Sequence, residues 1–121
     1  MTFRFSPGQR IRQSAEFDTI LKTGKRFSLS CFAMCVKPNA LAFSRLGVMI
    51  GKRYCPLAVN RNRIKRLVRN YFRLHQARLL SVDVVFLLKS KTDNVTDQAQ
   101  VTCIASLFED CIAQLGGVAS N

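Results

Sequence analysis

The sequence predicts an α+β sandwich in which about three helices cover a mixed four-stranded sheet. First, the chain has 121 residues, 48% of them hydrophobic, which is enough for one domain with its own core. Second, three segments carry apolar residues at helical spacing. Third, four short segments either alternate between two sets of side chains or are continuously apolar, as β-strands are. The predicted order is α-β-β-β-α-β-α, within a single domain over residues 1–121.

The N-terminal part is predicted to contain a basic lead-in and a short helix. Residues 1–12 read as an extended, basic segment. Ser14 is a suitable N-cap and Gly24 a suitable C′ residue for the helix that follows. Phe17, Ile20 and Leu21 are spaced i, i+3, i+4 and therefore form one apolar stripe.

Four strands are predicted near residues 26–30, 31–37, 45–51 and 82–90. In the second strand, Phe32, Met34 and Val36 alternate with Cys31, Ala33 and Cys35. Since alternate side chains point to opposite faces, the larger set is expected to face the core. The fourth strand is apolar and rich in β-branched residues, so it is expected to be central.

Two longer helices complete the predicted fold. Pro56 suits a first helical turn, and that helix is expected to run to about Leu79. The last helix is expected over residues 98–115, ended by Gly116 and Gly117, with residues 118–121 as a frayed tail. Its predicted inward residues are Val101, Ile104, Leu107, Phe108, Cys111, Ile112 and Leu115. The strand–helix–strand unit around residues 45–90 would be right-handed by the general rule for parallel crossovers.

The charge is strongly asymmetric, which points to a polyanionic partner. The net charge is +12; residues 1–78 hold 17 Lys and Arg against two acids, whereas residues 79–121 hold two Lys against five acids. A small domain with one strongly basic part commonly binds nucleic acid. A membrane surface is less well supported, because no helix combines this charge with large apolar anchors. The chain also lacks both an apolar run of about 20 residues and a secretory h-region, so a cytoplasmic location is expected.

The cysteines do not indicate a metal site. Five cysteines stand at positions 31, 35, 55, 103 and 111, with no C-x-x-C and with His75 as the only histidine. An odd number without an export signal favours reduced thiols. Without a C-x-x-C pair or a second histidine, a zinc site is not expected. Cys103 and Cys111 are expected to fill apolar space on the last helix.

The segment "NRNRIKRLVRNYFR", residues 60–73, combines a basic face with an apolar face. Arg61, Lys65, Arg69 and Arg73 recur every four residues, with Asn62 and Arg66 beside them. Like charges at this spacing repel by a few tenths of a kcal/mol per pair, so a phosphate partner is expected to offset the cost. On the same helical projection, Arg61 and Arg63 should face solvent. Because this helix is embedded in a mixed domain rather than projecting, RNA is favoured over the DNA major groove.

The segment "RLGVMIGKRYCPLAVNRNRIKRLVRNYF", residues 45–72, resembles the signature of the protein subunit of bacterial ribonuclease P. In that family a strand R-x-G-x-x-(V/I) leads to a K-(K/R) turn and then to R-N-R-x-K-R-x-x-R on a helix. The corresponding residues are Arg45, Gly47, Lys52, Arg53, Arg61, Asn62, Arg63, Lys65, Arg66 and Arg69. The resemblance extends to "RIRQSAEFDTIL" and "DVVFLLK", and so covers nearly the whole chain.

The resemblance implies both a fold and a function. The family fold is an αβ sandwich with a left-handed crossover, shared with a ribosomal protein domain, which conflicts with the general handedness rule. Ribonuclease P removes the 5′ leader from precursor tRNA; its catalyst is an RNA that holds Mg²⁺, and the protein raises the affinity for substrate and magnesium. No catalytic or metal-binding residue is therefore expected on this chain, which would be a monomer when free.

The resemblance also implies two groups of contact residues. The catalytic RNA would be bound by Lys52, Arg53, Arg61, Asn62, Arg63, Lys65, Arg66, Arg69 and Arg73. The leader would lie in a cleft lined by Arg10, Arg12, Phe17, Leu21, Cys31, Ala33 and Cys35. Related proteins often carry aromatic residues where this chain has Leu21 and Cys35, so base stacking is expected to contribute less here.

Two other functions remain as alternatives. A protein nuclease that uses metal ions would need clustered carboxylates, but Glu16 and Asp18 point to different faces of a helix and Glu109 and Asp110 are adjacent. His75 falls on the apolar side of its helix and is expected at the core or its boundary. A ribosomal or general RNA-binding structural protein would share the charge. The joint presence of the Arg61–Arg69 pattern and the Phe17 helix discriminates against it, and specific binding to one large RNA and its precursor tRNA complex would separate the two.

Overall fold

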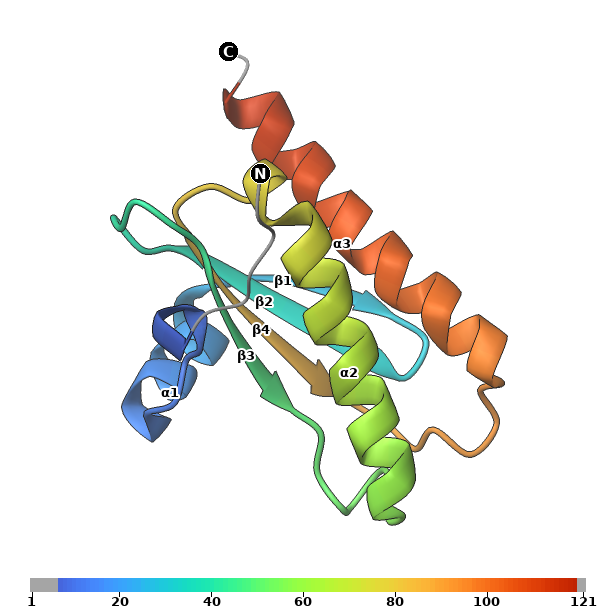
Figure 1. Cartoon of the computed structure of the whole chain (residues 1–121). Coiled ribbons are helices and arrows are strands. Elements are labelled where there is room, and N and C mark those ends of the chain that lie inside the picture. Colours follow the sequence, from blue (N-terminus) through green and yellow to red (C-terminus); the bar gives the residue numbers. More distant parts are fainter. Residues whose placement is uncertain (1–6, 120–121) are drawn as a thin grey trace.

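The computed structural model describes residues 7–119, which form one layered domain (Figure 1). A short 3₁₀ turn, η1 (Pro7–Gln9), leads to helix α1 (Ser14–Thr23), and strands β1 (Lys25–Leu29), β2 (Phe32–Pro38) and β3 (Arg45–Met49) follow. Helix α2 (Ala58–His75), the 3₁₀ turn η2 (Gln76–Arg78), strand β4 (Val82–Leu88) and helix α3 (Asp97–Ala119) complete the chain. The predicted order and the mixed four-stranded sheet are confirmed.

The sheet has the strand order β1-β2-β4-β3, so β4 is central as predicted. Strand β2 pairs antiparallel with β1 and β4, while β3 runs parallel to β4. The register aligns Arg26, Cys35, Val85 and Gly47 in one row across the four strands. Paired residues in neighbouring strands point to the same face, and this alignment positions the site described below.

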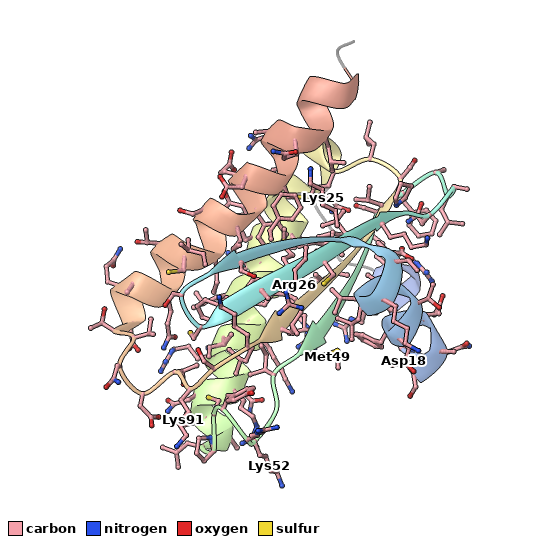
Figure 2. All side chains as sticks on the ribbon, turned by 180° about the vertical axis from the view of Figure 1, so that it is seen from behind. Asp18, Lys25, Arg26, Met49, Lys52 and Lys91 are labelled. Atoms are coloured by element: carbon pink, nitrogen blue, oxygen red, sulfur yellow. The ribbon has the colours of Figure 1, made fainter. Side chains whose placement is uncertain are left out.

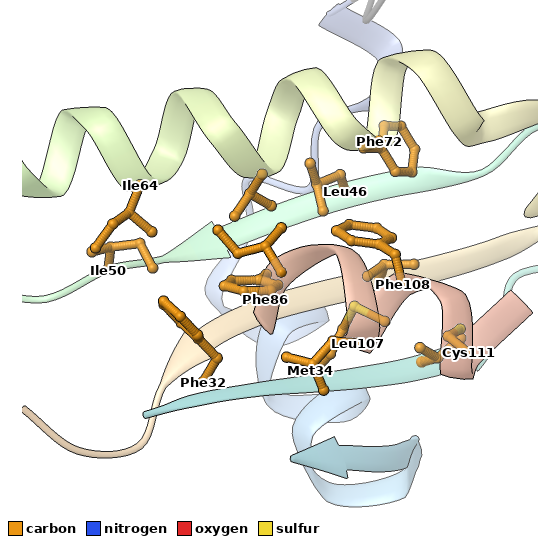
Figure 3. Packing of buried hydrophobic residues seen from close by; sticks show 14 of the residues in the cluster. Phe32, Met34, Leu46, Ile50, Ile64, Phe72, Phe86, Leu107, Phe108 and Cys111 are labelled. Carbon is orange, nitrogen blue, oxygen red and sulfur yellow. The ribbon is translucent and has the colours of Figure 1, made fainter. Parts of the chain in front are cut away.

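The two faces of the sheet carry separate cores. Helices α2 and α3 cover one face, where Phe32, Met34, Phe72, Phe86 and Phe108 are completely buried (Figure 3). Helix α1 covers part of the opposite face, where Ile11, Ile20, Cys35 and Val85 form a smaller cluster with Phe17, Leu21 and Leu87. The prediction that Phe32, Met34 and Val36 face the main core is confirmed, because all three belong to it.

The crossover from β3 through α2 to β4 is left-handed. In Figure 1, α2 lies in front of the sheet, β3 and β4 both run downward, and β4 lies to the right of β3. A right-handed unit with strands pointing down would place the second strand on the left. The general rule is therefore wrong for this chain.

Several element ends differ from the predicted ones. Ser14 is the first residue of α1 rather than its cap, and the preceding Gln13 makes no capping hydrogen bond through its side chain. Gly24 does end α1, donating its N–H to the Ile20 carbonyl, but its φ of −77° is not left-handed. A Cβ at this position would lie 2.6 Å from the Ile20 carbonyl oxygen, so the site requires glycine for close approach.

The C-terminal helices also depart from the prediction. Helix α2 ends at His75 rather than near Leu79, and Leu74 is 44% exposed although its spacing suggested burial. Helix α3 continues through Gly116 and Gly117, which the sequence had suggested as its end; glycine weakens a helix by about 1 kcal/mol without preventing it. Val101, predicted to point inward, is 43% exposed on the outer side of α3. Residues 120–121 of the predicted tail lie outside the described residues.

The helices within residues 7–119 include none whose length and apolar character would suit a membrane span.

Candidate nucleic-acid interface

The basic face of α2 forms one wall of an open groove. The N-terminal segment contributes Arg10, and α2 contributes the remaining lining residues: Asn62, Lys65, Arg66, Arg69, Asn70 and Arg73. The groove has a volume of about 540 Å³, and none of its lining residues is acidic. The structure thus brings five predicted RNA-binding residues of α2 together and adds Arg10, which the sequence had assigned to the leader cleft.

The like charges in this groove are close enough to perturb each other. Partial burial, and then the nearby Arg10 guanidinium, lower the pKa of Arg69 below the ordinary arginine value. Neighbouring cations without an acid between them are a binding site for an anion, because a phosphate would reduce the repulsion. Chains of phosphates, as in a nucleic-acid backbone, match a groove that presents several such cations in a row.

A second, smaller hollow of about 210 Å³ continues from the groove. Arg10 and Arg69 line both hollows, and the second also contains Ile11, Arg12, Phe17, Leu46, Gly47 and Val48. The N-terminal segment is fixed here because the Ile11 N–H donates to the Leu46 carbonyl at 3.0 Å. Arg10, Arg12 and Phe17, predicted together for the leader cleft, therefore do lie together, directly beside the α2 groove.

The "R-x-G" part of the signature segment positions α1 against the sheet. The Arg45 guanidinium donates to Asp83 on β4 and to Glu16 on α1, at 2.6 Å and 2.8 Å. Gly47 lies under the Phe17 ring, since a Cβ at residue 47 would be 2.5 Å from a ring carbon. An ion pair and a close aromatic contact therefore hold α1 against the sheet.

Two arginines of the signature, predicted to face solvent, are only partly exposed and make contacts within the protein. Arg61 donates to the carbonyls of Cys55 and Pro56, at 3.0 Å and 2.6 Å, and so braces the turn before α2. Arg63 reaches toward α3, where it pairs with Asp97 at 3.0 Å and donates to Gln100. A helical projection describes one helix only and does not show which neighbouring carbonyls or acids a long side chain reaches.

The turn before α2 presents Lys52 and Arg53 at the surface, as predicted, and a neighbouring loop adds two lysines. The Tyr54 carbonyl accepts the Thr92 N–H at 3.2 Å, which joins this turn to the loop after β4. Lys89 and Lys91 of that loop are exposed, and Figure 2 shows Lys52 and Lys91 at the same end of the molecule. These lysines are not distinguished by the sequence, because only the approach of their loop to the turn places them near Lys52 and Arg53.

The proposed leader-cleft residues on β2 are too buried to meet a ligand. Ala33 and Cys35 have no exposed surface, and Cys31 lies in the β1–β2 turn with its side chain in the main core rather than on the α1 face. The alternation fails at Cys31 because a turn precedes β2 at Phe32. Assigning these three residues to the surface of the cleft was therefore wrong.

Other side chains are exposed on the face of the sheet that α1 partly covers. Arg26 and Ser28 of β1 are exposed, Met49 of β3 is 41% exposed, and Leu87 is half-buried (Figure 2). Arg26 lies beside the Cys35 thiol, whose pKa is raised by burial, an effect that the arginine opposes. Extending the predicted alternation to β1 and β3 would have found Arg26, but its alignment with Cys35 and Gly47 required the register.

Glu109 and His75 lie at the contact between α2 and α3. Glu109 accepts hydrogen bonds from Arg78 and Tyr71, and His75 stacks on the Tyr71 ring at 4.2 Å. His75 is thus a boundary residue between α2 and α3, as predicted. Within residues 7–119, no three His, Cys, Asp or Glu side chains gather as a metal site would require.

An acid-free groove between a crossover helix and the N-terminal segment, on a mixed sheet, defines a nucleic-acid-binding α+β protein. Comparison with known proteins identifies the family. The model of the ribonuclease P family matches residues 5–111, and the chain belongs to this family. It is 34% identical over 106 residues to the ribonuclease P protein component of Chromobacterium violaceum, covering 88% of each chain.

Other similar proteins support the same assignment. The ribonuclease P protein component of Methylococcus capsulatus is 37% identical, over 77% of this chain and 73% of that one. The solved structure of the RNase P protein of Staphylococcus aureus is 25% identical and superposes with a TM-score of 0.76, covering 85% of this chain and 94% of that one. The chain is accordingly an RNA-binding subunit of an endoribonuclease that processes tRNA, and its α+β fold is that of the family.

Proposed function

We propose that this chain binds the catalytic RNA of ribonuclease P through the α2 groove and the adjoining basic turn. The contact residues would be Lys52, Arg53, Asn62, Lys65, Arg66, Arg69 and Arg73, with Lys89 and Lys91 extending the turn. The observation that carries this proposal is the groove itself, which has several cations and no acid among its lining residues. Arg61 and Arg63 would act indirectly, by holding the turn and α3 in place.

The 5′ leader of precursor tRNA would lie on the α1 face of the sheet. Arg10, Arg12 and Phe17 line the hollow beside the groove, and Leu21 is half-buried in the same small core. From there the exposed Arg26 and, one row further along the strands, Leu87 and Met49 would continue the path on the same face of the sheet. Because these side chains offer charge and apolar area but no aromatic ring, we propose that the leader is bound there with little preference for particular bases.

The same proposal implies where the magnesium is bound, where the protein is located and its oligomeric state. The Mg²⁺ needed for cleavage would be held by the RNA subunit, which performs the chemistry. The protein would be cytoplasmic, where precursor tRNA is made, and a monomer when free of RNA.

Reconstitution tests this function directly. The purified chain is mixed with a bacterial ribonuclease P RNA, and cleavage of precursor tRNA is followed at low magnesium, with each component alone as a control. Cleavage restored only in the mixture supports the proposal. A mixture of folded chain and matching RNA that shows no stimulation would favour a general RNA-binding protein instead, whereas cleavage by the protein alone would reveal an active site on the chain.

The groove is tested in the same assay by a pair of variants. Arg66→Ala removes an exposed side chain of the groove, and Lys22→Ala removes an exposed cation of α1 that is absent from the lining residues of both hollows. The proposal predicts that R66A lowers the affinity for the RNA and that K22A has a much smaller effect. Equal losses would show that only net charge matters.

A further inference from the structure

The loop between β2 and β3 is held in one conformation by its own hydrogen bonds. The Leu41 N–H donates to the Asn39 Oδ1 at 2.8 Å, and the Asn39 Nδ2 donates to the Phe43 carbonyl at 3.1 Å. The turn before β4 fastens it further, since the Ser81 Oγ donates to the Leu41 carbonyl at 2.6 Å and the Asn39 N–H donates to the Ser81 carbonyl. Two loops distant in sequence thus form one ordered unit.

The backbone of this unit is strained at two positions. Ala40 and Ser81 have φ values of 58°, in the left-handed region that residues other than glycine rarely adopt. Such conformations cost about 1 kcal/mol or more each, and they persist only where the surroundings impose them. The hydrogen bonds of Asn39 and Ser81 impose them here, so the loop is preorganised.

The ordered unit presents three large apolar side chains to solvent. Leu41 is 38% exposed, Phe43 is 41% exposed and Leu80 is 70% exposed. We call these three residues the loop patch. A flexible loop could turn such side chains inward, whereas the hydrogen-bonded unit holds them at the surface.

The loop patch lies where the α2 groove ends. Ser44, which follows Phe43, accepts a hydrogen bond from the Gln9 Nε2, and the same nitrogen donates to Gln76 just beyond α2. Arg10, the next residue after Gln9, lines the groove, and Gln76 donates to the carbonyl of Arg73, which lines it too. The backbone next to Phe43 is thus linked through Gln9 and Gln76 to the Arg73 end of the groove.

The acid next to the loop patch is already engaged within the protein. Asn39 of this loop donates to Asp83 at 2.9 Å, and the Asp83 carboxylate also accepts two hydrogen bonds from Arg45. An exposed aromatic ring beside a basic groove is the arrangement by which proteins bind unpaired nucleotides, with phosphates on the cations and a base on the ring.

We propose that an unpaired base of the RNA in the α2 groove stacks on Phe43, with Leu41 and Leu80 packing against the nucleotide. This inference rests on the proposed function, because it assumes that RNA occupies the groove. The loop patch would be a second, apolar anchor at the opposite end of the sheet from Lys52 and Arg53. It would supply an exposed aromatic ring, which the part of the leader path at Arg26, Met49 and Leu87 lacks.

Binding measurements with the full chain and a bacterial ribonuclease P RNA, with and without precursor tRNA, test the proposal. Phe43→Ala should weaken affinity about 5- to 100-fold, the range expected for one stacked base. Phe43→Tyr should retain affinity near that of the wild type, and Phe43→Leu should fall between them. Val101→Ala is the matched control, because Val101 is similarly exposed on α3, away from the groove. Thermal unfolding of each variant establishes that it is folded.

The outcomes separate this inference from the proposed function. If F43A binds RNA like the wild type while R66A binds weakly, the stacking role of Phe43 is wrong and the groove assignment stands. If F43A changes self-association in sedimentation rather than RNA affinity, the loop patch is an interface between copies and the inference also fails. If the folded wild-type chain does not bind the RNA, the proposed function fails first and the inference with it.

Discussion

The ring of Phe17 lies on the backbone of Gly47, so closely that a Cβ at residue 47 would be 2.5 Å from a ring carbon. The contact joins α1 to β3 beside the hollow that Arg10 and Arg12 also line. It explains why a glycine stands in the middle of β3, where it would otherwise weaken the strand. The position of α1 therefore depends on one missing methyl group.

Gly47→Ala is expected to lower the free energy of unfolding by about 1–3 kcal/mol, the usual cost of overpacking. The added methyl must displace the Phe17 ring or shift α1. Thermal or denaturant unfolding measures the loss, and Gly51→Ala is the control, because a Cβ at residue 51 meets no atom within 4 Å. If both variants are equally stable, the Phe17 contact is not tight in solution.

The ion pairs of Arg45 are expected to contribute more to stability than the other arginine pairs. The Asp83 side chain is 9% exposed and that of Arg45 is 18% exposed, so Arg45→Ala leaves a buried carboxylate unpaired. Such a loss typically costs about 3–5 kcal/mol. Denaturant unfolding should show it, together with a loss of protection of α1 in hydrogen exchange.

The control for the stability loss of Arg45→Ala is Arg78→Ala. Arg78 pairs with Glu109 in an exposed position, with 48% and 42% of the two side chains accessible, and exposed pairs contribute little to stability because water screens the charges. A loss for R78A as large as that for R45A would contradict the role given to burial.

The Tyr71 hydroxyl is expected to ionise at a higher pH than an ordinary tyrosine. Burial, and then its hydrogen bond to the Glu109 carboxylate, raise the pKa of Tyr71 to about 12. Since the neutral phenol is favoured in the folded state, its contribution to stability is complete below the unfolded pKa of about 10 and is lost as the pH rises through the folded pKa. Ultraviolet titration should show a late phenolate transition that Tyr71→Phe abolishes. A late transition that remains in Y71F would assign it to Tyr54.

Much of the fold was predictable from the sequence because its periodicities are local. The stripe of Phe17, Ile20 and Leu21, the alternation in β2 and the apolar run of β4 each specify one element and its buried side. The handedness of the crossover is not local, and the general rule gave the wrong answer. The resemblance gave the correct hand because it carries information about the whole chain.

The candidate site was predictable only in part, for a related reason. Spacing placed Lys65, Arg66, Arg69 and Arg73 on one face of α2, and all four line the groove. The addition of Arg10 depends on the pairing of the N-terminal segment with Leu46, which spacing does not show. Likewise, Arg26 becomes part of the site only through the register of β1.

Replacing Arg63 by alanine is expected to lower stability, whereas replacing Arg66 by alanine is expected to lower the affinity for RNA. Arg63 pairs with Asp97 and donates to Asn60 and Gln100, so its loss should destabilise the contact of α2 with α3. Arg66 is exposed in the groove, so its loss should weaken RNA binding with little change in stability. Each phosphate contact removed should also reduce the slope of log affinity against log salt by about 1. Unfolding curves together with binding at several salt concentrations measure both effects. A reduced salt slope for R63A at unchanged stability would show that Arg63 leaves Asp97 to contact the RNA.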